Sequence, residues 1–298
     1  MELLDSPART AHIDAMMAAT RKIPENAAMH PLLRALLDAR IPAVMGVLNI
    51  TPDSFSDGGA FLAPDDALAQ ARRMIADGAA ILDIGAESTR PYGSTPVSAD
   101  DEIQRLAPVL KKVAALGTPV SIDSMKAHVV AWALEQGAQI ANDVWGLQRD
   151  ADMARVVAEH NVPVIIMHNR ETVDPAIDIV KDMITFFTRS LAIAAKVNIP
   201  DGNIVLDPGI GFGKTPRQSM IALARLRELE FFGLPILVGA SRKKFIDSVS
   251  PAPPQQRIGG SLAAHLLAAR SCARIIRAHD VAETVQALRV QAAIEDAS

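Results

Sequence analysis

The sequence predicts an α/β fold, a (β/α)8 TIM barrel in a single domain with a short N-terminal helical extension, from two observations. Eight short apolar runs alternate with Ala-rich stretches in which apolar residues recur every three or four positions, the spacing of an amphipathic helix. Eight strand–helix units within about 250 residues match the number and size of units in such a barrel. A doubly wound open sheet is the alternative, but that fold does not need eight units.

The apolar runs have the length and composition of strands buried in a parallel sheet. They are Ala43–Leu48, Ala80–Ile84, Pro119–Ile122, Gln139–Ala141, Pro163–Met167, Asn203–Leu206, Pro235–Val238 and Ala273–Ile276. Hydrophobic residues form 49% of the chain and aromatic residues only 4%, so Ala, Val, Ile and Leu must fill the core. Helical stretches end on Gly78-Ala79 and Gly137-Ala138, and a glycine commonly follows the last residue of a helix.

We expect residues 41–298 to form the barrel domain and residues 1–40 to form the N-terminal extension. Within the extension, the stretch MHPLLRALLDAR (residues 29–40) looks helical. We expect this helix to cover the bottom of the barrel, and no chemistry is assigned to it.

Charge and cysteine content exclude several classes of protein. A formal net charge of −4 without runs of like charge gives no basis for binding nucleic acid. The single cysteine, Cys272, excludes an intramolecular disulfide and a cysteine-rich metal site, which is typical of a reducing compartment. No convincing targeting signal and no membrane-spanning stretch are found, so we expect a cytoplasmic protein without membrane partners.

Groups that can hydrogen-bond or carry charge stand at the end of every predicted strand. They are Asn49; Asp83; Asp123; Asn142 and Asp143; Met167, His168 and Asn169; Asp207; the stretch GASRKK with Lys243; and Arg277, His279 and Asp280. In a barrel these positions lie at the C-terminal face, where active sites are assembled. Helix capping explains one or two such residues, but not all eight sets.

The polar residues divide into two chemical sets. Asp83, Asp123, Asp207 and Asn142 supply acceptors and an amide, which suit a ligand with several N–H donors, such as the aminopyrimidinone edge of a pterin or guanine. Lys243 adds a cation to this set. The second set, Arg277, His279 and Asn49, suits an anion with or without a divalent ion, and hard oxygen ligands with an oxyanion favour Mg2+.

Two loops stand out. The stretch GIGFGKT is not a phosphate-binding P-loop, because that motif needs a glycine where Pro208 stands. We expect Gly209, Gly211 and Gly213 to form a tight turn that lets Phe212 lie over a flat ligand. The stretch NITPDSFSDGG (residues 49–59) is too long and polar for a plain turn, and long polar loops on rigid strands are often functional.

Eight ordered motifs resemble those of dihydropteroate synthase. They are MGVLNITPDSFSDGG, LDIGAESTRP, SIDS, ANDVWG, IIMHNR, LDPGIGFGKT, LVGASRKKFI and IIRAHDV, and the match covers residues 43 to about 295. The resemblance implies a (β/α)8 barrel that joins 6-hydroxymethyl-7,8-dihydropterin diphosphate to 4-aminobenzoate and releases pyrophosphate, in folate biosynthesis. Two residues depart from the family pattern: Tyr92 stands where Gly is usual, and Lys244 where Ser is common.

The resemblance also implies roles for particular residues. The pterin site would comprise Asp83, Asp123, Asn142, Met167, Asp207, Phe212, Gly239, Lys243 and Arg277. The 4-aminobenzoate site would comprise Thr89, Arg90, Pro91, Phe212 and Ser241. The diphosphate would bind Asn49, Asp53, Arg90, Arg277 and His279, and Asn49 would also contact Mg2+. The catalytic residues would be Asp123, Asp207, Lys243 and Arg277.

Further expectations accompany these roles. Residues 49–59 would form a lid whose Asp53 and Ser54 reach the pyrophosphate. The C–O bond would break before the amine attacks. Sulfonamides would inhibit the enzyme, and the small, apolar stretch GGSLAAHLLAARSCA would join two copies into a homodimer. A pterin-dependent methyltransferase and a non-catalytic pterin-binding paralogue remain as alternatives, and His168 could either fix its loop or contact ligand.

Substrate binding should be ordered, with the pterin diphosphate first and 4-aminobenzoate second. The first ligand would order the loops and remove that entropic cost for the second. Asp53→Ala should weaken this coupling while the pterin pocket stays intact. Calorimetry tests it, and 4-aminobenzoate binding as tightly to the free enzyme as to the pterin–pyrophosphate–Mg2+ complex would contradict it.

Overall fold

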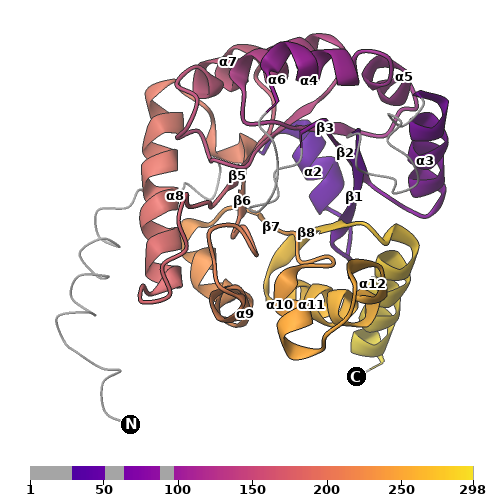
Figure 1. Ribbon diagram of the computed structural model, residues 1–298, viewed down its shortest axis with the longest axis vertical. Coiled ribbons are helices and arrows are strands. Elements are labelled where there is room, and N and C mark those ends of the chain that lie inside the picture. The colour runs from indigo at the N-terminus through magenta and orange to yellow at the C-terminus, as the bar shows by residue number, and fades with distance from the viewer. Residues whose placement is uncertain (1–28, 51–63, 88–96, 298) are drawn as a thin grey trace.

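A closed parallel barrel forms the centre of the molecule, which confirms the predicted fold (Figure 1). The computed structural model describes residues 29–50, 64–87 and 97–297. The strands are β1 (Ala43–Asn49), β2 (Ile81–Gly85), β3 (Val120–Asp123), β4 (Ile140–Asp143), β5 (Val164–Met167), β6 (Ile204–Asp207), β7 (Ile236–Val238) and β8 (Ala273–Ala278). Because β8 pairs with β1, from Ala43 opposite Ile275 to Gly46 opposite Ala278, the sheet closes and an open sheet is excluded.

Helices surround the strands (Figure 1). They are α2 (Pro31–Leu37), α3 (Pro64–Ala76), α4 (Ala99–Leu106), α5 (Leu110–Ala114), α6 (Ala127–Glu135), α7 (Met153–His160), α8 (Ile179–Lys196), α9 (Pro216–Ala224), α10 (Lys244–Val249), α11 (Ile258–Ser271) and α12 (Val281–Asp296), with short 3-10 turns at Asp201–Asn203, Leu226–Phe232 and Pro254–Gln256. The predicted glycine terminators follow α3 and α6, since Gly78 and Gly137 have φ of +99° and +106°. None of the helices in the described ranges is long and apolar enough to cross a bilayer.

The alternation of side chains along each strand separates two environments. On β2, Leu82 and Ile84 belong to the large core between strands and helices, whereas Ile81 belongs to a second cluster inside the barrel. Asp83, two residues after Ile81, therefore also points inward, one layer nearer the mouth. On β6 the same alternation applies: Val205 belongs to the inner cluster, and Asp207, two residues later, also points inward, nearer the mouth.

Helix α2 closes the bottom of the barrel, as its sequence indicated. Leu33 and Leu37 are buried against inward residues such as Met45, Ile165 and Ile275. The helix begins with Pro31 at its first position, where a missing N–H costs nothing. One end of the barrel is thus filled by apolar side chains, and the other is left for polar ones.

Several strands extend beyond the predicted runs. β4 was expected to stop at Ala141 but continues through Asn142 and Asp143, and β8 continues from Ile276 to Ala278. The polar residues at these ends are therefore part of the hydrogen-bonded sheet. Their backbones are held rigidly, which fixes where their side chains point.

Leu33→Ala should lower the free energy of unfolding by about 2–5 kcal/mol, because it opens a cavity in the apolar plug. Denaturant unfolding measures the change. Val249→Ala is the control, since Val249 is 69% exposed and its loss should change stability by about 0.5 kcal/mol or less. Equal effects of the two substitutions would show that α2 does not contribute to the barrel core.

Candidate active site

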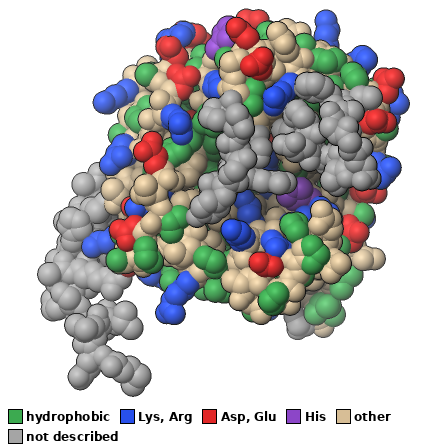
Figure 2. All heavy atoms as spheres, viewed as in Figure 1, with side chains coloured by type: hydrophobic (Ala, Val, Ile, Leu, Met, Phe, Trp, Pro, Cys, Tyr) green, Lys and Arg blue, Asp and Glu red, His purple; other side chains and the backbone are tan. Residues whose placement is uncertain are grey.

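The mouth of the barrel holds a pocket built from six strands and the loops that follow them. Its lining residues are Asp123, Asn142, Val144, Met167, Asp207, Gly209, Ile210, Phe212, Gly239, Lys243 and Arg277. Eight of the nine residues assigned to the pterin site from the sequence are among them. In Figure 2, Lys or Arg side chains and a histidine are visible near the centre of the face that is viewed.

The ninth residue, Asp83, lies next to the pocket and binds its arginine. The Arg277 guanidinium donates to Asp83 Oδ2 at 2.6 Å and to Asp123 Oδ2 at 2.7 Å. Asn142 Nδ2 also lies 3.3 Å from both oxygens of Asp83. Arg277 also lines the pocket, so these contacts hold its guanidinium on the side where Asp83 and Asp123 lie.

Asp123 offers an acceptor to a ligand. Its Oδ1 is buried and has no hydrogen-bond partner among the described residues. Burial raises the pKa of this carboxyl to about 7, although Arg277 acts in the opposite direction. A buried acceptor without a donor is costly, so this oxygen can gain a hydrogen bond from an N–H group that enters the pocket.

Asp207 is the second buried carboxylate of the pocket. Its Oδ1 accepts the backbone N–H of Gly209 at 2.7 Å. Burial raises the pKa of Asp207 to about 6, while this hydrogen bond and the charge of Lys243 lower it. Near neutral pH the carboxylate is ionised in surroundings that water screens poorly.

Phe212 forms an apolar wall of the pocket. It packs with Val144 and Met167, and the Lys243 Nζ lies 4.1 Å from the centre of its ring. The predicted tight turn is confirmed, because all three of its glycines have positive φ: +62° at Gly209, +85° at Gly211 and +55° at Gly213. The turn gives the pocket a flat side suited to a planar ring.

His279 and Ser241 lie together near Arg277. The Ser241 Oγ is 3.0 Å from His279 Nδ1 and also accepts the backbone N–H of His279 at 3.2 Å. Burial lowers the pKa of His279 to about 3, and the neighbouring cations Arg277, Arg242 and Lys243 add to the effect. His279 is therefore neutral in the ligand-free chain and can act as a hydrogen-bond donor, while Arg277 supplies permanent positive charge.

The remaining residues singled out in the sequence either lie outside the described residues or stand at the edge of the site. Asp53 and the rest of the expected lid beyond Ile50, like Thr89, Arg90, Pro91 and Tyr92, lie outside the described residues. Asn49 is the last residue of β1, opposite Gly85 of β2 and half-buried. Lys244 begins α10 with an exposed side chain.

Some pocket residues were missed by the sequence analysis. Val144 and Ile210 supply apolar walls of the pocket. They follow strand ends, but an apolar side chain carries no charge or hydrogen-bonding group that could mark it as a site residue in the sequence. His168 is buried and does not line the pocket; it contacts Asp182 and Lys214 instead. Of the two roles left open for His168, the contacts favour the fixing of its loop. No role was assigned to Lys214.

Comparison of the sequence with known families agrees with this geometry. Residues 45–279 match the model of the family described as pterin binding enzyme. The chain is 41% identical to dihydropteroate synthase of Bacillus subtilis (strain 168) over 277 residues, which is 93% of this chain and 96% of the relative. It is also 41% identical to that of Escherichia coli (strain K12) over 261 residues, 85% of this chain and 92% of the relative.

Solved structures show the same similarity. A Clostridium difficile dihydropteroate synthase structure, obtained in the presence of pteroic acid, has a TM-score of 0.82 and 43% identity over 86% of this chain and 97% of that one. The Xanthomonas albilineans enzyme with 4-aminobenzoic acid has a TM-score of 0.82 and 40% identity over 86% of this chain and 94% of that one. This chain therefore belongs to the pterin binding enzyme family, among the dihydropteroate synthases.

Proposed function

We propose that the pocket holds the dihydropterin ring while the enzyme joins 6-hydroxymethyl-7,8-dihydropterin diphosphate to 4-aminobenzoate, giving 7,8-dihydropteroate and pyrophosphate. The observation that carries this assignment is the buried Asp123 Oδ1, which has no donor within the described part of the chain. A related Xanthomonas albilineans enzyme has been solved in complex with 7,8-dihydropteroate, which supports the same use of the pocket.

Recognition of the pterin combines acceptors with apolar walls. Asp207 and Asp123 would accept N–H groups from the ring, and Asn142 would complete that edge. Lys243 would donate to the ring carbonyl. Phe212 and Met167 supply apolar surface. Hydrogen bonds would therefore recognise the edge of the ring, and apolar side chains would cover its faces.

The same carboxylates suit a dissociative reaction. If the C–O bond breaks before the amine attacks, positive charge develops on the pterin. Asp123 and Asp207 are already fixed and buried, so they stabilise that charge without reorganisation of solvent. No covalent nucleophile is required.

The diphosphate would occupy the rim beside β1 and β8. Arg277 would supply charge and the neutral His279 a hydrogen bond. Among the residues that the structure describes, no three His, Cys, Asp or Glu side chains form a metal cage. A single protein oxygen beside the diphosphate fits Mg2+, because this ion usually keeps several waters and binds substrate phosphates with one or two protein oxygens. The Asn49 amide oxygen would be such a ligand, and bound Mg2+ would neutralise charge on the leaving pyrophosphate.

The second substrate would enter beside Ser241 and Phe212. By resemblance, Thr89, Arg90 and Pro91 would complete the site. The 4-aminobenzoic acid complex of the Xanthomonas albilineans enzyme supports this substrate. A sulfonamide complex of the Yersinia pestis enzyme, with a TM-score of 0.81, supports inhibition of this chain by sulfonamides.

The two alternatives have less support. A methyltransferase does not need the Arg277 and His279 anion set, and the relatives at 41% identity are named dihydropteroate synthase. A non-catalytic paralogue would be expected to lose pocket residues, yet the carboxylates, Lys243 and Arg277 are all in place.

Cys272 has no part in this proposal. It ends α11 just before β8, and burial raises the pKa of its thiol to about 11. The thiol therefore stays protonated near neutral pH and acts as a small apolar group. A cytoplasmic location, suggested by the single cysteine, stays a prediction.

Two copies would associate through α11 and α12. Arg270 lies 3.7 Å from Glu295, so the end of α11 is beside the end of α12. Leu267 lies one turn before Arg270 on α11, and its side chain is 48% exposed. Ile294 directly precedes Glu295 on α12, and its side chain is 66% exposed. These side chains place exposed apolar surface on neighbouring helices, as expected of an interface between identical subunits.

The overall reaction has a direct test. Purified protein should release pyrophosphate only when the pterin diphosphate, 4-aminobenzoate and Mg2+ are all present. Release that does not depend on 4-aminobenzoate would indicate hydrolysis and contradict the transfer reaction.

Asp207→Asn should weaken pterin binding about 10- to 100-fold, because an amide loses the charge and cannot accept two N–H groups as a carboxylate does. Calorimetry measures the affinity, and circular dichroism checks the fold. Asp38→Asn, at the exposed end of α2, is the control. Binding by Asp207→Asn at wild-type strength would refute the pocket assignment.

Pterin affinity should fall as the pH is lowered. The pKa of Asp207 is raised to about 6 and that of Asp123 to about 7, and the ionised forms bind, so affinity is full above both pKa values and declines as the pH falls through them. For one proton the decline approaches about tenfold per pH unit. The probe should be 6-hydroxymethyl-7,8-dihydropterin, since a diphosphate itself titrates in this range. Equal affinity at pH 8 and pH 5, with the fold intact at both, would contradict this role.

Ile294→Asp should convert the dimer to monomer, because a charge on an apolar interface must be desolvated. Sedimentation at micromolar concentration gives the mass. Val173→Asp, at an exposed position outside α11 and α12, should remain dimeric. A monomeric wild type would remove the basis of the proposal.

A further inference from the structure

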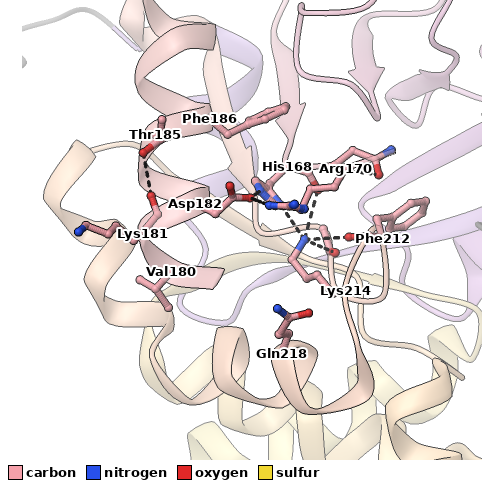
Figure 3. A network of polar contacts seen from close by, with 12 residues as sticks. His168, Arg170, Val180, Lys181, Asp182, Thr185, Phe186, Phe212, Lys214 and Gln218 are labelled. Carbon is pink, nitrogen blue, oxygen red and sulfur yellow. Dashed lines mark hydrogen bonds and ion pairs between the residues drawn. The ribbon is translucent and has the colours of Figure 1, made fainter. Parts of the chain in front are cut away.

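Lys214 is a buried lysine directly behind the pterin pocket, and burial lowers the pKa of its amino group to about 7, although Asp207 and Asp182 act in the opposite direction. It follows the turn that carries Phe212, and only 6% of it is exposed. Its Nζ lies 2.6 Å from His168 Nδ1, 2.9 Å from the Gly209 carbonyl oxygen and 3.1 Å from the Phe212 carbonyl oxygen (Figure 3). When the amino group is protonated it has three hydrogens, and these three acceptors satisfy them.

The arrangement of protons around His168 follows from its neighbours. Its Nε2 lies 3.0 Å from Asp182 Oδ2, and the same oxygen pairs with Arg170 at 2.9 Å. Burial lowers the pKa of His168 to about 4, and Lys214 adds to this effect, so the ring is neutral. Because the carboxylate only accepts, Nε2 carries the hydrogen and Nδ1 accepts from Lys214 (Figure 3).

The two loops joined by Lys214 touch each other through their backbones. A Cβ on Gly209 would lie 2.0 Å from the His168 carbonyl oxygen. A Cβ on Gly213 would lie 2.4 Å from Arg170 Cβ. The loop after β6 can therefore pack on the loop after β5 only with glycine at both points. The Lys214 Nζ lies beside the first of these contacts, 3.5 Å from the His168 carbonyl oxygen.

The turn connects the lysine to both sides of the pocket. At one end, the Gly209 N–H donates to the Asp207 carboxylate at 2.7 Å. At the other, the Phe212 carbonyl accepts from Lys214, and the Phe212 ring forms the pocket wall. A shift of the turn would therefore displace both Asp207, which would bind the edge of the pterin, and Phe212, which would cover its face.

We propose that Lys214 is a positioning residue for the pterin: it fixes the Gly209–Phe212 turn, and the chain of contacts through His168 to Asp182 holds the lysine in place. The proposal rests on the pterin pocket assigned above. Lys214 does not line that pocket, so it acts through Asp207 and Phe212. The diphosphate residues on β1 and β8 lie outside its contacts.

This separation gives a differential test with Lys214→Met, which keeps the apolar stem and removes the ammonium group. The Kd for 6-hydroxymethyl-7,8-dihydropterin should rise at least tenfold. The Kd for inorganic pyrophosphate with Mg2+ should stay within twofold of the wild type. Lys181→Met, at an exposed lysine on α8, is the matched control and should change neither value.

Two results would overturn the proposal. Unchanged pterin affinity in Lys214→Met would show that the turn holds without the lysine. Equal loss of pterin and pyrophosphate binding would show a general structural role. If Lys214→Met does not fold, Asp182→Asn decides instead, because its partly exposed carboxylate does not touch Lys214 and reaches it through His168, although it also pairs with Arg170. It should raise the pterin Kd at least threefold without a change for pyrophosphate.

The pocket assignment and this proposal can fail separately. If Asp207→Asn binds the pterin normally, the pocket itself is misassigned. If Asp207→Asn loses binding and Lys214→Met does not, the pocket stands and only the positioning role is wrong.

Discussion

Closure of the parallel sheet is the constraint on which the site depends. In a closed barrel every strand must direct alternate residues inward, and the inward positions form layers. In the lower layer, Ile81 and Val205 join the side chains of α2 in an apolar plug. Two residues later on the same strands, Asp83 and Asp207 stand one layer nearer the open end, where Asp207 lines the pocket and Asp83 binds its arginine. The polar pocket and its apolar floor thus both follow from the two-residue alternation of side chains along the strands.

The pocket contains more charge than a buried core would tolerate without pairing. In the ligand-free chain, Arg277 satisfies Asp83 and one oxygen of Asp123. The second oxygen of Asp123 is left without a partner among the described residues. Burial keeps the pKa values of Asp123 and Asp207 raised, so each carboxylate gains from an N–H donor or from a developing positive charge. The buried carboxylates that are costly to leave unpaired are those that a pterin and its cation would use.

Precision at the mouth comes from contacts behind the pocket. Strand ends are fixed by the sheet, but Phe212 lies on a turn that has no sheet partner. The turn is held by backbone contact with the loop after β5 and by the buried Nζ of Lys214. A residue that never meets the ligand can thereby decide how well the ligand fits.

The sequence by itself determined the barrel, the positions of its strands to within one or two residues, and the polar residues at its mouth. These follow from local information: apolar runs, helical spacing, glycine at helix ends, and the type of residue that ends each strand. The tertiary structure decided which of these residues meet. It placed Arg277 on Asp83 and Asp123, separated by 194 and 154 positions in the chain, made His279 neutral, and gave Lys214 and His168 a shared buried site. Pairing and desolvation depend on distances between loops that are remote in sequence, and no local pattern contains those distances.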